Sequence, residues 1–148
     1  MLFRSEKMIR EFKIKDLERV MEIWLESNID AHSFIDKKYW EDNYEMVKEI
    51  LPSAEIYLYE ENKNILGFVG LMENYIAGIF VEKNFHSQGV GRKLLDWCKS
   101  LKRELTLSVY EKNQKAYSFY IREGFQVVEK KIDENTSEIE LVMYWRGD

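Results

Sequence analysis

Two glycines stand between an apolar run and an amphipathic run, and this junction constrains the fold more than any other stretch of the chain. The run YIAGIFVE (75–82) predicts a buried strand, and RKLLDWCKSLKREL (92–105) predicts a helix. HSQGVG (86–91) joins them. A helix N-terminus offers unpaired N–H groups and the positive end of the helix dipole, and glycines let an anion approach that backbone closely. The junction therefore predicts a strand–loop–helix unit that can bind phosphate.

The spacing around these glycines excludes two nucleotide-binding motifs. The dinucleotide fingerprint needs a third glycine at the position of Leu94. A P-loop needs Gly-Lys-Ser/Thr after a four-residue spacer, and the sequence has none. Taken alone, the glycine pair fits a tight strand-to-helix turn without a ligand as well as it fits a phosphate site.

Composition predicts one globular domain over residues 1–148, with residues 1–7 as a candidate N-terminal extension. Hydrophobic residues make up 45% of the 148 residues and charged residues 33%, an ordinary balance for a soluble domain. The net charge of −5 argues against a nucleic-acid face, because such faces are basic. The single cysteine, Cys98, excludes an internal disulfide framework and a cysteine-based zinc site. We interpret it as a buried structural thiol.

No apolar run approaches the ~20 residues that span a bilayer, and the N-terminus has no signal-peptide core. We therefore expect no membrane partner and a soluble, cytoplasmic protein. The oligomeric state stays open between monomer and homodimer, since the C-terminal run LVMYW (141–145) could support a dimer.

Hydrophobic periodicity and turn signals predict the order β-α-α-β-β-β-α-β-α-β-β, a mixed sheet of the α/β (α+β) class with helices on its faces. The strands are expected at 8–14, 55–60, 65–72, 75–82, 105–111, 125–132 and 139–145. Asp16 is expected to cap a first helix that SNIDAHSF (27–34) interrupts, and Asp36 to start a second helix that ends before Pro52. Asn113 is expected to cap the last helix, which Gly124 ends.

Two segments, read together, identify a family. IFVEKNFHSQGVGRKLL (79–95) resembles the strand–loop–helix motif Gln/Arg-x-x-Gly-x-Gly/Ala of the GCN5-related N-acetyltransferase (GNAT) superfamily. NQKAYSFYIREGF (113–125) resembles its motif Asn-x-x-Ala-x-x-Phe-Tyr-x-x-x-Gly-Phe. The predicted element order over residues 8–146 is similar to that of the superfamily. The N-terminal region of this chain resembles that of small bacterial protein-lysine or related acetyltransferases. The resemblance implies a GNAT-like, mostly antiparallel sheet with a splay between two central parallel strands.

The resemblance also implies acetyl-CoA as cosubstrate, an amine acceptor as partner, and no metal. Acetyl transfer would proceed by direct attack of a primary amine in a ternary complex. The implied cofactor-binding residues are Ile79, Phe80, Val81, His86, Ser87, Gln88, Gly89, Val90, Gly91, Arg92, Asn113, Ala116 and Tyr120. His86 departs from the motif, which usually has Arg or Gln there. It could hydrogen-bond phosphate, or be an exposed loop histidine without an essential role.

Acetyl transfer needs a neutral amine, although a lysine amine with a pKa of about 10.4 is almost wholly protonated at pH 7. A base must therefore accept a proton, and an acid can protonate the departing thiolate. Tyr120 is the candidate acid: it shares a helix face with Asn113 and Tyr117, at i, i+4 and i+7, and it matches the tyrosine proposed for this role in the family. The other interpretation of Tyr120 is a core aromatic.

The base is open. Some relatives have a glutamate at the position of Ser108, which cannot serve as a base unaided. Glu73, after the run ILGFVGLM, is the first candidate. The other interpretation of Glu73 is a solvated glutamate in a hairpin turn. His32 is the second candidate, because a histidine pKa can suit a base. The other interpretation of His32 is a residue that shapes its loop. Glu111 or a chain of waters could also serve.

The alternative function is an acyl-CoA-binding sensor or interaction module with weak catalysis, which the serine at 108 would suit. The acceptor is open too: a protein lysine, a protein N-terminus or a small-molecule amine fits the sequence, because the fold does not fix the acceptor.

Overall fold

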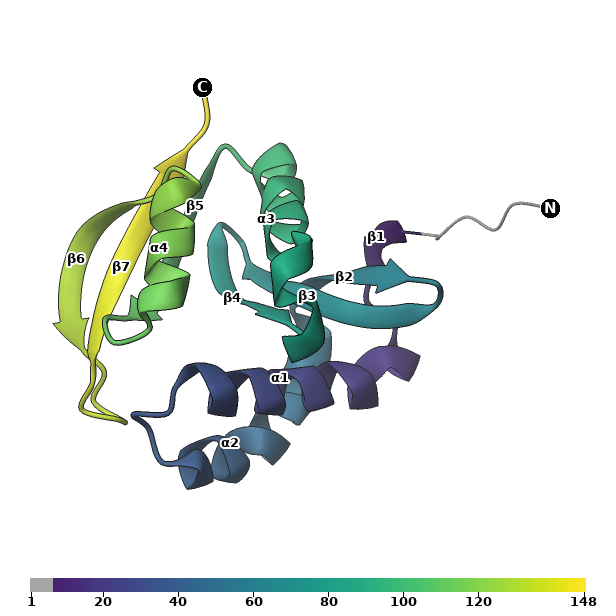
Figure 1. Ribbon diagram of the computed structural model, residues 1–148, viewed down its shortest axis with the longest axis horizontal. Coiled ribbons are helices and arrows are strands. Elements are labelled where there is room, and N and C mark those ends of the chain that lie inside the picture. The colour runs from purple at the N-terminus through teal and green to yellow at the C-terminus, as the bar shows by residue number, and fades with distance from the viewer. Residues whose placement is uncertain (1–6) are drawn as a thin grey trace.

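A seven-stranded sheet organises residues 7–148, the part of the chain that the computed structural model describes (Figure 1). Its spatial order is β1-β2-β3-β4-β5-β7-β6. The strands are β1 (Lys7–Glu11), β2 (Glu55–Glu61), β3 (Asn64–Met72), β4 (Tyr75–Val81), β5 (Glu104–Tyr110), β6 (Gln126–Ile132) and β7 (Ile139–Arg146). All neighbours are antiparallel except β4 and β5. The predicted mixed, mostly antiparallel sheet is confirmed.

Four helices cover the two faces of this sheet (Figure 1). They are α1 (Leu17–Ala31), α2 (Lys37–Ile50), α3 (Val90–Leu101) and α4 (Gln114–Arg122). α1 and α2 lie against one face, and α3 and α4 against the other (Figure 1). Among the helices formed by residues 7–148, none has the length and apolar character needed to cross a membrane.

The parallel strands β4 and β5 stay together over only two residue pairs. Tyr75 pairs with Thr106 and Ile76 with Leu107, and beyond that point the strands separate. The register between β3 and β4 also shifts after Gly70, so that Ala77 is an extra residue in β4. Such a bulge bends its strand. The predicted splay between the two central parallel strands is therefore present and begins beside this bulge.

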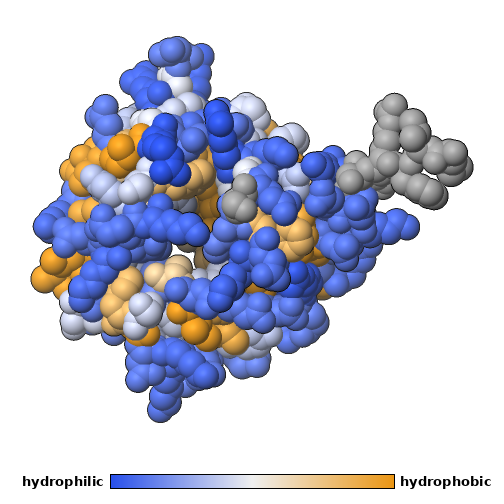
Figure 2. Space-filling view, viewed as in Figure 1, coloured by the Kyte–Doolittle hydropathy of each residue, from blue (hydrophilic) through white to orange (hydrophobic). Residues whose placement is uncertain are grey.

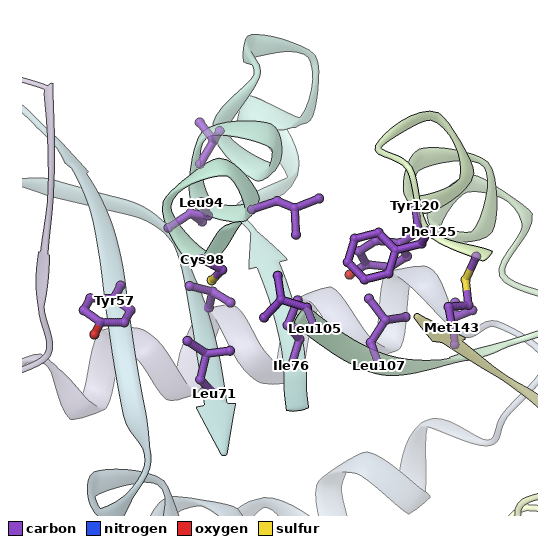
Figure 3. Packing of buried hydrophobic residues seen from close by; sticks show 14 of the residues in the cluster. Tyr57, Leu71, Ile76, Leu94, Cys98, Leu105, Leu107, Tyr120, Phe125 and Met143 are labelled. Carbon is purple, nitrogen blue, oxygen red and sulfur yellow. The ribbon is translucent and has the colours of Figure 1, made fainter. Parts of the chain in front are cut away.

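The core on the α3/α4 side lies between these two helices and the sheet (Figure 3). Leu94 and Cys98 of α3 contact the sheet there, and Leu107 of β5 lies under Tyr120 of α4 (Figure 3). Cys98 is fully buried, and burial raises the pKa of its thiol to about 12. It is the buried structural thiol that the sequence predicts.

Two boundaries near the N-terminus differ from the prediction. The first strand ends at Glu11 rather than at residue 14, and Lys7 pairs with Glu61 within the sheet instead of belonging to an extension. Residues 1–6 lie outside the described residues. α1 continues through the predicted break to Ala31, because the Asn28 amide donates to the Trp24 carbonyl one turn back instead of ending the helix.

Asp16 precedes α1 as predicted, but its carboxylate does not cap the helix. It accepts the Lys13 N–H at 2.8 Å and pairs with the Arg10 guanidinium at 2.9 Å. Arg10 also lies 3.2 Å from Glu60 of β2. This buried carboxylate therefore fastens the start of α1 to the first two strands.

Candidate active site

A cleft of about 680 Å³ opens where β4 and β5 part. Figure 2 shows the molecular surface hollowed between the side that carries α4 and the side that carries α3. The predicted site residues that line this cleft are His32, Ile79, Phe80, Val81, His86, Gly89, Gly91, Arg92, Asn113, Ala116 and Tyr120. Glu73, Gln88 and Val90 do not line it. The side chain of Ser87 is outside the described part of the structure.

The edge of β4 that β5 leaves turns backbone groups toward the cleft. The Val81 carbonyl faces away from β3, because it lies 2.8 Å from Nε2 of His86. Backbone groups alternate in direction along an antiparallel strand, so those of Ile79 face the same side. With β5 turned away, the backbone groups of Ile79 can bind the amides of an extended ligand arm, whereas the Val81 carbonyl already contacts His86.

The start of α3 is a candidate anion site beside that edge. Gly89 has φ +76°, a left-handed conformation that favours glycine, and it turns the chain from the loop into the helix. Val90 is buried and anchors the first turn. Four basic side chains also line the cleft: His86, Arg92, Lys115 and Arg122. A helix N-terminus among cations fits the phosphates of a CoA molecule.

Asn113 joins the two sides of the cleft. Its Oδ1 accepts the Ala116 N–H at 3.2 Å and caps α4, as predicted. Its Nδ2 lies 3.3 Å from Nε2 of His32, just past the end of α1. The side chain therefore positions α4 and His32 together.

His32 lies in an aromatic wall. Its ring stacks on Trp40 with centroids 5.2 Å apart and meets Phe34 and Tyr110 edge-on. Burial lowers the pKa of the imidazole to about 4, so the ring is neutral at pH 7. A group whose conjugate acid is this strong accepts protons poorly, which weakens the hypothesis that His32 is the base.

Tyr120 enters the cleft from α4. Its ring is buried, contacts Phe119 and Phe125 edge-on, and points from α4 toward the sheet (Figure 3). Burial raises the pKa of its hydroxyl well above the usual value, so Tyr120 stays protonated at neutral pH. The hydroxyl therefore holds a proton at neutral pH, and the same raised pKa makes it a weaker acid than a free phenol. Tyr120 also belongs to the core, so a core position and a cleft position are compatible.

Glu73 lies in the tight turn between β3 and β4, with φ +57° and an exposed side chain. Because it does not line the cleft, the hypothesis that it is the base has no geometric support. Ser108, by contrast, lines the cleft on β5.

Sequence reasoning missed Glu140 on β7, which also lines the cleft. It pairs with Tyr110 of β5, whose hydroxyl donates to Asp133 at 2.6 Å. The alternation in IELVMYW places Glu140 opposite the buried face of Leu141 and Met143, but only the pairing of β7 with β5 brings it to the split.

A parted parallel pair, a glycine-led helix N-terminus and a buried tyrosine define a CoA-dependent acyltransferase. The family model described as "Acetyltransferase (GNAT) domain" matches residues 52–127. Peptidyl-lysine N-acetyltransferase YiaC of Escherichia coli is 35% identical over 140 residues, covering 93% of this chain and 96% of the relative.

Solved structures agree in fold. The solution structure of apo YjaB from Escherichia coli superposes with a TM-score of 0.85 at 27% identity, covering 97% of this chain and 99% of that one. The crystal structure of the PaiA N-acetyltransferase from Thermoplasma acidophilum in complex with coenzyme A gives a TM-score of 0.80 at 21% identity, with 95% and 99% covered. The chain belongs to the GNAT family of acetyltransferases and is an acetyl-CoA-dependent acyltransferase.

Proposed function

We propose that this protein transfers the acetyl group of acetyl-CoA to the ε-amine of a lysine in a peptide or protein, by direct attack in a ternary complex. One observation carries the proposal: a single cleft at the β4–β5 split is lined by residues from both faces of the sheet. Donor and acceptor can then meet from opposite faces. The similarity to YiaC, whose name specifies peptidyl-lysine, supports this acceptor class.

The donor would lie on the α3/α4 side. The backbone of β4 from Ile79 to Val81 would bind the pantetheine arm, and the N–H groups after Gly89 would bind the pyrophosphate. Arg92 and Lys115, which line this end, would add positive charge. Gln88 and Val90 would contribute main-chain groups only, since their side chains do not line the cleft.

Tyr120 would give its proton to the sulfur as the carbon–sulfur bond breaks. Its protonated state at neutral pH supports this role, and so does its position on the α4 wall. Asn113 and His32 would position the side chains that line the cleft rather than react. The Asn113 amide already contacts the Ala116 N–H and the His32 imidazole.

A binding module without catalysis is the second candidate, because β5 presents Ser108 to the cleft where some relatives have a carboxylate. Thiol release from acetyl-CoA separates the two functions. A peptide with one lysine and a blocked N-terminus should release CoA thiol, and mass spectrometry should locate the acetyl group on the lysine.

The matched control is the same peptide with its lysine already acetylated, which should give background release. A free-N-terminus peptide without lysine and a polyamine complete the panel. Acetyl-CoA binding by calorimetry without thiol release from any acceptor would contradict the proposal and favour the binding module. Release only with the polyamine would contradict the peptide assignment.

A further inference from the structure

The split has two faces that differ in chemistry. Leu105, Leu107 and Val109 of β5 point into the core beneath α3 and α4. The alternate residues Ser108 and Tyr110 point to the face that carries α1 and α2. Since Tyr120 and the phosphate end of the cleft belong to the α3/α4 side, an acceptor has to arrive from the α1/α2 side.

Glu140 lies on that acceptor side. It is the residue of β7 directly opposite Tyr110, and directly opposite residues point to the same face with Cβ atoms about 5 Å apart. Among the described residues that line the cleft, the only other acid is Glu123. Glu123 lies at the end of α4, 3.8 Å from both Lys99 and Arg92, so it belongs to the donor side.

The Glu140 carboxylate is uncommitted. Within residues 7–148 it makes no hydrogen bond or close ion pair, although Lys131 lies opposite it on β6. Tyr110 on β5, Asp133 after β6 and Tyr39 on α2 are the other titratable groups around it. Partial burial and the charge of Asp133 raise its pKa above the usual value, which makes it a better proton acceptor than an exposed glutamate.

The surroundings of Glu140 suit a long side chain that ends in an ammonium group. Rings of His32, Trp40 and Tyr110 line the same part of the cleft and can pack along a lysine stem. A carboxylate at the end of an aromatic channel attracts the ammonium. Asp133 also lies near these rings, but its carboxylate already accepts a hydrogen bond from the Tyr110 hydroxyl. Glu140 is therefore the carboxylate that can bind the ammonium.

We infer that Glu140 binds the acceptor ammonium and takes its proton, directly or through one water. This inference rests on the proposed lysine acetylation. The ammonium gives one proton to Glu140, and the freed lone pair forms the nitrogen–carbon bond. The carbon–sulfur bond then breaks, the sulfur takes a proton from Tyr120, and Tyr120 regains one from the acylated nitrogen. The proton on Glu140 leaves to solvent, so that ammonium and thioester become amide, thiol and one proton.

The test is the pH dependence of kcat/KM for a one-lysine peptide with Glu140→Gln, which keeps the shape and removes the base. We expect kcat/KM at pH 7 to fall by roughly 10²-fold, as for other general bases. In the variant, kcat/KM should rise about tenfold per pH unit up to the amine pKa, because only the amine that is already neutral reacts. Wild type should instead reach a plateau near neutral pH. An acyl hydrazide acceptor, which is neutral at pH 7 because its acyl group lowers the basicity of the terminal nitrogen, should show little loss.

Glu138→Gln is the matched control, since Glu138 loses the same charge two residues away, pairs with Lys112 at 3.0 Å and does not line the cleft. It should keep the wild-type profile, and Glu140→Asp should recover part of the rate. Acetyl-CoA affinity and thermal melting should match wild type in all three variants. An active wild type with an unchanged Glu140→Gln profile overturns the inference alone. A wild type inactive on every lysine peptide overturns the proposed function and the inference with it.

Discussion

The carbonyl oxygen of Val81 lies 2.8 Å from Nε2 of His86, and Nδ1 of the same ring lies 3.2 Å from Nζ of Lys115. One imidazole therefore links the end of β4, the loop before α3 and the first turn of α4. A neutral ring meets both contacts, with Nε2–H donating to Val81 and Nδ1 accepting from Lys115. The histidine that departs from the family motif has a structural task in this protein.

His86→Ala should weaken binding of acetyl-CoA. Loss of the contact to Val81 removes a hydrogen bond worth about 1 kcal/mol and loosens the loop whose N–H groups would bind the phosphates in the proposed complex. We expect the Kd measured by calorimetry to rise about fivefold. Lys83→Ala, an exposed change in the same loop, is the control. Equal or tighter binding by His86→Ala would show that the ring obstructs the ligand instead.

Asp16→Asn should lower the free energy of unfolding at pH 7 by about 2–3 kcal/mol, because it leaves Arg10 with one partner fewer in a part-buried site. The Arg10 hydrogen bonds lower the pKa of Asp16, so its stabilisation is present above the unfolded pKa near ~4 and is lost as the pH falls through the lower, folded value. Urea unfolding should show the gap to wild type narrowing toward pH 2.

Asp42→Asn serves as the control for that comparison, because Asp42 is exposed on α2. It should change the unfolding free energy little at either pH. A gap between wild type and Asp16→Asn that stays constant from pH 7 to pH 2 would mean that the Asp16 charge does not stabilise the fold.

His32→Phe should leave the shape of the pH profile unchanged between pH 6 and 9. The imidazole has a pKa of about 4 and is neutral throughout this range, so it contributes no titration there. The phenyl ring can keep the stacking on Trp40 and removes a buried Nδ1 that has no hydrogen-bond partner. We expect a loss in kcat/KM below about tenfold and little change in melting temperature, because removal of the unpaired Nδ1 offsets loss of the Nε2 contact with Asn113. Loss of an ionisation from the profile would restore His32 as the base.

Local signals in the sequence predict much of the fold. Asn113 and Gly124 mark the two ends of α4, and Asp36 caps α2 by accepting the Lys38 N–H, because caps depend on single side chains and nearby backbone. The end of α1 was missed because Asn28 bonds within the helix instead of ending it. A local pattern cannot separate these two uses of an asparagine.

The cleft was only half predictable for a similar reason. The side of the cleft next to α3 and α4 is predicted from two contiguous motifs, and Gly89, Gly91 and Arg92 of the first motif and Asn113 and Ala116 of the second line it. Its acceptor side depends on strand pairing between β5 and β7, segments that a helix and a strand separate along the chain. The cleft position of Glu140 follows from that register, which no single stretch of sequence determines.

The most direct measurement of acetyl transfer through the split compares Tyr120→Phe with wild type at saturating acetyl-CoA and lysine peptide. Tyr117→Phe, on the same helix but outside the cleft, is the matched control. Loss of the proton donor should reduce kcat by roughly 10²-fold while the Kd for acetyl-CoA stays within about twofold, and Tyr117→Phe should keep the wild-type kcat. A wild-type kcat in Tyr120→Phe would contradict the assignment of the proton donor.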